Sequence, residues 1–162
     1  VEGLRQMRRM DLGLVVVTNQ SGIGRSYFDQ QRLAEIHARM LELLAVENIF
    51  LDGIYHCPHI PDAGCECRKP KTGMILQAAA DLHFKPENCF VIGDKPCDIE
   101  LGQGVNATTL LVKTGYGAQV AATQTADPDY VVQDLTEAAR VIHTVLNGGV
   151  RIGDETKDAV AC

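Results

Sequence analysis

The chain has 162 residues, of which 46% are hydrophobic and 22% charged, and its formal net charge is −6. This balance suits one globular domain with its own core, and the negative charge argues against nucleic acid or an anionic membrane surface as the main partner. The apolar runs are too short to cross a membrane, and residues 1–11 lack the apolar core of a secretory signal. We therefore expect a cytoplasmic protein with reduced cysteines.

The first half of the chain alternates helical patterns with apolar runs. Residues 1–10 have the spacing of an amphipathic helix, and the apolar run 12–17 suits a parallel strand buried on both faces. Residues 20–25 contain two glycines and predict a loop. Asp29 is a suitable N-cap for a long helix, and residues 54–55 predict a short strand.

The second half continues the same alternation. Apolar segments predict strands at residues 89–92, 109–112 and 130–132. The remaining periodic segments predict helices from Thr72 to about Leu82, from near Asp98, and over residues 135–146 with Gly148 and Gly149 ending the last one.

Strands that alternate with helices predict an α/β fold with a mainly parallel sheet. We expect one domain over residues 1–147, and the tail 148–162 has no pattern that assigns it a role. Ligands of such sheets bind at the carboxyl ends of the strands. Thr18 and Asp94 both follow predicted strands, so the chemistry is expected to collect there.

Thr18 opens the stretch Thr-Asn-Gln-Ser-Gly-Ile-Gly-Arg, which ends at Arg25. A hydroxyl and free backbone N–H groups at a strand end can donate hydrogen bonds to a phosphoryl group. Taken alone, the same stretch is also compatible with ordinary turn chemistry.

Charged residues mark two further stretches. Lys69 can neutralise a phosphoryl group and Arg68 can bind one bidentately, although adjacent cations are also common on surfaces. Asp94 follows a glycine at a strand end, where a carboxylate can hold Mg²⁺. Asp98, four residues further on, is compatible with a simple helix N-cap.

A Cys/His group lies in residues 57–67. Three thiols and one imidazole within eleven residues match a closed, tetrahedral, structural Zn²⁺ site, whereas unliganded thiols on a loop are the alternative. The expected ligands are Cys57, His59, Cys65 and Cys67.

In this order, the stretches resemble the haloacid-dehalogenase (HAD) phosphatases: Thr18 resembles their second motif, Lys69 their third and Gly93-Asp94 their fourth. The cysteine loop resembles the one shared by heptose bisphosphate and histidinol-phosphate phosphatases. Residues 15–25, Lys69-Pro70 through Gly73-Met74, and Gly93-Asp94-Lys95 are more similar to the heptose enzymes. The resemblance implies a three-layer Rossmann-like fold and a cytoplasmic, monomeric, Mg²⁺-dependent phosphatase of a small sugar bisphosphate.

The family's first motif, Asp-x-Asp-Gly-Thr, has no counterpart in the chain. In the family this motif ends the first, central strand, between the threonine strand and the Gly-Asp strand. Its absence implies two exposed inner edges, an N-terminally incomplete enzyme and no turnover, because the first aspartate is the nucleophile and the second is the acid and base.

The resemblance also implies roles for the residues that are present. Thr18 and Lys69 would stabilise phosphoryl charge and Asp94 would hold Mg²⁺. Substrate contacts would come from Asn19, Gln20, Ser21, Arg68 and Lys95, with Arg25 near the entrance. A histidinol-phosphate or other sugar-phosphate phosphatase, a non-catalytic zinc-containing binding domain and a non-functional remnant are the alternatives.

Overall fold

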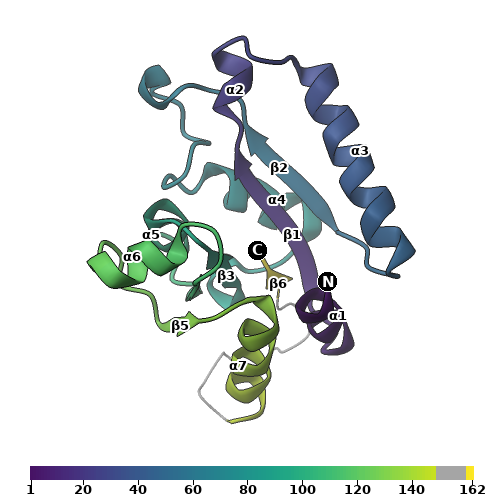
Figure 1. The fold of residues 1–162 in the computed structure, drawn as a ribbon, viewed down its shortest axis with the longest axis vertical. Helices are drawn as coiled ribbons and strands as arrows, with labels where there is room; N and C mark the ends of the chain where they lie inside the picture. The colour runs from purple at the N-terminus through teal and green to yellow at the C-terminus, as the bar shows by residue number, and fades with distance from the viewer. Residues whose placement is uncertain (149–159) are drawn as a thin grey trace.

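The computed structural model describes residues 1–148 and 160–162, which form a six-stranded parallel sheet covered by helices on both faces (Figure 1). The strand order is β2-β1-β6-β3-β4-β5. The strands are β1 (Gly13–Asn19), β2 (Gly53–Cys57), β3 (Phe90–Gly93), β4 (Thr108–Val112), β5 (Tyr130–Val132) and β6 (Val160–Ala161). The described α-helices are α1 (Glu2–Arg9), α2 (Ser21–Gly24), α3 (Gln30–Val46), α4 (Gly73–Leu82), α5 (Pro96–Gln103), α6 (Gly117–Thr123) and α7 (Leu135–Asn147).

Two apolar clusters, one on each side of the sheet, make up most of the core. One joins α1 and α7 to sheet residues such as Leu14 and Phe90, and the other joins α4 and α5 to Val15 and Val91. Neighbouring residues of a strand point to opposite faces, so a strand covered on both sides is apolar at nearly every position. This arrangement confirms the predicted three-layer α/β fold.

Two short helices depart from the sequence-based expectation. The predicted loop 20–25 contains the single turn α2, where Gly22 packs so closely on the Phe28 ring that a Cβ would lie 2.3 Å from it. Helix α6 was not predicted because its short sequence has little apolar periodicity, and Val120 is its only buried large side chain. Thr72 precedes α4 as expected, but its side chain makes no capping hydrogen bond.

The gap between β1 and β3 is partly filled by the end of the chain. Strand β6 pairs in parallel with Gly13 and Leu14 of β1 and with Phe90 of β3. The expectation of two fully exposed inner edges is therefore wrong for the amino-terminal part of the gap. The rest of the tail, residues 149–159, lies outside the described residues.

Among the described residues, no helix has the length and apolar character needed to cross a bilayer.

Candidate active site

The carboxyl ends of β1 and β3 bring the predicted phosphate-binding and metal-binding residues to the same edge of the sheet. Thr18 lies near the end of β1 and Asp94 directly follows β3. Both side chains are half-buried. Thr18 Oγ1 accepts a hydrogen bond of 3.1 Å from Gln20 Nε2, so the hydroxyl hydrogen stays free to donate to a ligand.

Asn19 holds the segment that carries Lys69. Its Oδ1 accepts a 3.0 Å hydrogen bond from the Lys69 backbone N–H, and its Nδ2 donates a 3.2 Å hydrogen bond to the Lys69 carbonyl. Together these two bonds join the Asn19 amide to the backbone of a residue 50 positions away, with the donor and acceptor pattern of paired strands. In this structure the Asn19 amide therefore positions Lys69, and sequence reasoning had assigned Asn19 only to substrate.

The Lys69 ammonium is nearly buried and has two partners. Nζ donates to the Val17 carbonyl at 2.7 Å and lies 2.7 Å from Asp98 Oδ1, with 13% of the lysine side chain and 9% of the aspartate side chain exposed. The other oxygen, Asp98 Oδ2, accepts from the Lys95 backbone N–H at 3.1 Å. Asp98 therefore both caps α5 and fixes the lysine in place.

Asp94 is held by a tight turn after β4. Its Oδ2 accepts a 2.9 Å hydrogen bond from the Tyr116 backbone N–H. Gly115 has a φ of +59°, and a Cβ there would lie 2.2 Å from Asp94 Oδ2. The turn can approach the carboxylate only because Gly115 has no side chain.

The other predicted contact residues lie around this edge. Lys95 is exposed and its Nζ lies 4.7 Å from the centroid of the Tyr116 ring, a cation–π arrangement. Ser21 begins α2 and the exposed Arg25 follows it. Arg68 instead points at the cysteine loop, where its Nη1 donates to the His59 carbonyl at 3.2 Å.

Replacing Gly115 by alanine is expected to destabilise the fold by about 2 kcal/mol and to move the Asp94 carboxylate, because the left-handed backbone and the clash act together. Chemical denaturation measures the first effect. The control is Gly64→Ala, which has a φ of +69° and nothing within 4 Å of the added Cβ. Equal losses of unfolding free energy for the two variants would show that a clash with Asp94 does not contribute to the effect of Gly115→Ala.

The predicted zinc ligands converge. The donor atoms of Cys57, His59, Cys65 and Cys67 all lie within 4.8 Å of one another. Cys57 Sγ is 3.6 Å from Cys65 Sγ, and His59 Nδ1 is 3.3 Å from Cys67 Sγ. Tetrahedral ligands at Zn–S bonds of about 2.3 Å stand about 3.8 Å apart, so the separations in this donor group are close to those of a zinc site.

The thiols of this group differ in acidity. Burial raises the pKa of Cys65, but the backbone N–H of Arg68 and the neighbouring thiols outweigh it and lower the pKa to about 7. Burial and hydrogen bonding to Cys57 and Cys65 raise the pKa of Cys67 to about 12. Without a cation only part of the group is deprotonated at neutral pH, so a divalent metal that binds thiolates would complete the site.

Sequence reasoning missed two features of this edge. It treated Asp98 as a possible helix cap and did not foresee the ion pair with Lys69. It also passed over Gly115 and Tyr116, although two glycines within a few residues after a strand, Gly115 and Gly117, are a turn signal that could have drawn attention to them.

A parallel sheet covered by helices on both faces, with Thr18, Lys69 and Asp94 at its carboxyl edge, is the arrangement of a HAD-like hydrolase, and a model of the HAD-hydrolase-like family matches residues 66–138. The chain is 38% identical over 149 residues to the D-glycero-β-D-manno-heptose-1,7-bisphosphate 7-phosphatase of Pasteurella multocida, a match that spans 88% of this chain and 80% of that protein. The enzyme of the same name from Escherichia coli K12 is 35% identical over 150 residues, spanning 88% and 78%.

Solved structures agree with the sequence matches. The D,D-heptose 1,7-bisphosphate phosphatase from B. bronchiseptica, complexed with magnesium and phosphate, superposes with a TM-score of 0.81 and 31% identity over 88% of this chain and 80% of that one. The enzyme from Burkholderia thailandensis gives a TM-score of 0.69 at 26% identity, covering 88% and 83%. The chain belongs to the heptose bisphosphate phosphatase family of HAD-like hydrolases.

Proposed function

We propose that this chain carries the phosphate-binding and zinc-binding parts of a magnesium-dependent phosphatase that acts on D-glycero-D-manno-heptose 1,7-bisphosphate. The observation that carries the proposal is the 38% identity to the Pasteurella multocida 7-phosphatase, shared over 80% of that protein. The side chains at the sheet edge are suited to the same chemistry. We also propose that the protein is cytoplasmic and monomeric.

The residues at the carboxyl edge of the sheet would have separate roles in catalysis. The Thr18 hydroxyl and the Lys69 ammonium would stabilise negative charge on the transferring phosphoryl group. Asn19 positions Lys69, and Asp98 keeps its ammonium pointed at this edge. Lys95 and Arg25 add positive charge at the exposed rim, whereas Arg68 would have to leave the His59 carbonyl to reach a second phosphate.

Magnesium would be held by Asp94, whose Oδ2 is already oriented by the Tyr116 N–H. Bound there, the ion would neutralise phosphate charge in the manner of other hard, oxygen-liganded cations. Zinc would be held by the four residues of the cysteine loop, where its effect is to fold the segment that leads into Arg68 and Lys69.

Of the aspartates that the structure describes at this edge, Asp98 is paired with Lys69 and Asp94 is the proposed metal ligand, so neither is available for nucleophilic attack. We therefore expect the 162-residue polypeptide to release no inorganic phosphate from the heptose bisphosphate. We expect a longer polypeptide, extended by in-frame coding sequence upstream of Val1, to release phosphate if that sequence supplies an Asp-x-Asp-Gly-Thr strand.

A phosphate-release assay with both polypeptides tests the proposal. The substrates would be the α and β anomers of the heptose bisphosphate, histidinol phosphate and a generic phosphomonoester. Preference for histidinol phosphate would favour the alternative substrate. Release by the 162-residue chain would show that the expected inactivity is wrong. Zinc content without turnover in either polypeptide would favour a non-catalytic binding domain.

A further inference from the structure

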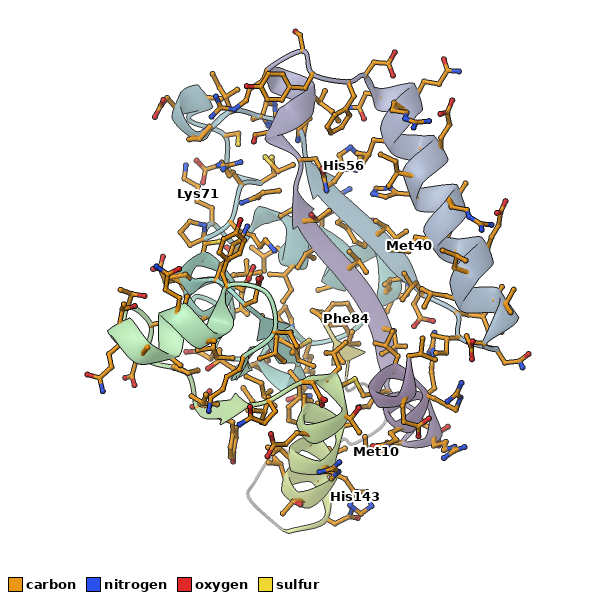
Figure 2. The ribbon with its side chains drawn as sticks, viewed as in Figure 1. Met10, Met40, His56, Lys71, Phe84 and His143 are labelled. Atoms are coloured by element: carbon orange, nitrogen blue, oxygen red, sulfur yellow. The ribbon has the colours of Figure 1, made fainter. Side chains whose placement is uncertain are left out.

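Helices α1 and α7 pack side by side on one face of the sheet, and a groove lies between the end of α1 and the later turns of α7 (Figure 1). The two helices touch closely at their first turns, where a Cβ on Gly3 would lie 2.3 Å from the Leu135 carbonyl oxygen. Further along, Met10 and His143 flank a hollow of about 440 Å³ (Figure 2). A hollow of this size can hold a small molecule.

This groove lies at the opposite edge of the sheet from the candidate active site. Arg9 and Met10 end α1 just before β1 begins at Gly13, whereas Thr18 lies near the far end of that strand. A strand of seven residues is about 20 Å long. The groove is also at the end of α1 away from Val1. A molecule bound there would be separate from the phosphate ester proposed for the carboxyl edge.

Two guanidinium groups and one imidazole line the groove, on the exposed side chains of Arg9, Arg140 and His143. Within the part of the chain that the structure describes, none of these three side chains makes a hydrogen bond or an ion pair. Most other described arginines pair with a carboxylate: Arg5, Arg8, Arg32 and Arg39. The groove therefore gathers two arginines whose donors stay free for a ligand.

Simpler reasons for these arginines do not account for both of them. A cation in the last turn of a helix offsets the negative end of the macrodipole, which can explain Arg9 in α1. Arg140 lies in the middle of α7, where the dipole gives no such reason. The carboxylates that attract the two arginines from a distance, Glu2 and Asp134, bond within α1 and cap α7, respectively. An anionic ligand would supply the close partner that both arginines lack.

The rest of the lining narrows the class of ligand. Met10 and the buried Ala139 give the groove an apolar floor. Asp11 lines the adjoining hollow and would repel an anion, so the charge is expected between Arg9 and Arg140. The net charge of −6 opposes a long polyanion, whereas a small dianion responds mainly to the cations around it. Guanidinium groups bind phosphate oxygens bidentately.

We propose that the groove between α1 and α7 is a second phosphate site, which binds a small phosphate monoester with an apolar part. Arg9 and Arg140 would hold the phosphate oxygens and His143 would donate an N–H, while the carbon skeleton lies on Met10 and Ala139. Because none of these residues belongs to the candidate active site, the proposal does not depend on the proposed function.

Isothermal titration calorimetry of the 162-residue chain with phenylphosphonate tests the proposal. The carbon–phosphorus bond resists a phosphatase, so binding is measured whether or not the chain is catalytic. We expect saturable binding of one molecule per chain, and severalfold weaker binding of methylphosphonate, which lacks the apolar ring. Arg9→Gln and Arg140→Gln are each expected to weaken binding by about tenfold, because each removes a charge-assisted contact.

Two control variants separate this site from general electrostatics and from the carboxyl edge. Arg39→Gln removes the same charge from an exposed ion pair on α3, and Thr18→Ala alters the candidate active site; both are expected to leave the affinity unchanged. In an NMR titration, the side-chain signals of Arg140 and His143 are expected to shift and that of Arg39 is not. Absence of saturable binding, equal weakening by Arg39→Gln and Arg140→Gln, or loss of binding in Thr18→Ala would overturn the proposal.

Discussion

Replacing Asp98 by asparagine is expected to lower the free energy of unfolding by about 3 kcal/mol, because it leaves the Lys69 ammonium nearly buried without a counter-charge. Asparagine keeps an oxygen that can still accept from the Lys95 N–H, so the cap on α5 survives and the lost charge dominates the result. Urea denaturation followed by circular dichroism measures the change.

An exposed ion pair supplies the control for this substitution. Arg39 and Glu42 lie 2.9 Å apart with side chains 66% and 65% exposed, and Glu42→Gln is expected to change stability by less than about 0.5 kcal/mol. The double variant Lys69→Met/Asp98→Asn is expected to regain part of the loss, since no charge is then left unpaired. Similar losses for Asp98→Asn and Glu42→Gln would mean that Lys69 and Asp98 are not effectively buried.

Removing zinc with a chelator is expected to lower the Tm by about 10 °C. A ligand at a thousand times its Kd stabilises the native state by about 4 kcal/mol, and each kilocalorie corresponds to about 2–4 °C in a domain of this size. The cysteine loop has little apolar packing apart from buried Cys57, so its folding depends on the metal. Differential scanning fluorimetry before and after chelation, with zinc added back, measures the effect.

A pair of cysteine substitutions separates zinc binding from general thiol chemistry. Cys67→Ser is expected to lose stoichiometric zinc, measured by atomic absorption. Cys97→Ser is expected to retain it, because Cys97 lies in α5 and outside the donor group. Wild-type protein purified under reducing conditions without one zinc per chain would contradict the assignment.

The sequence by itself determined the features that depend on local spacing. Valine-rich runs such as residues 12–17 predicted buried parallel strands, and the position of Thr18 and Asp94 after such runs predicted the edge at which they meet. The spacing of Cys57, His59, Cys65 and Cys67 predicted one metal site, and their donor atoms do converge. These features could be predicted because periodicity and short-range ligand spacing are properties of the chain itself.

Only the tertiary structure decided the contacts that join distant segments. Lys69 reaches Val17 across 52 positions and pairs with Asp98, and Gly115 makes room for Asp94 from the turn that follows another strand. Strand β6 could not be predicted, because a strand of two residues has no period to detect. Its place is set by the unpaired edges of β1 and β3, which exist only once the sheet has formed.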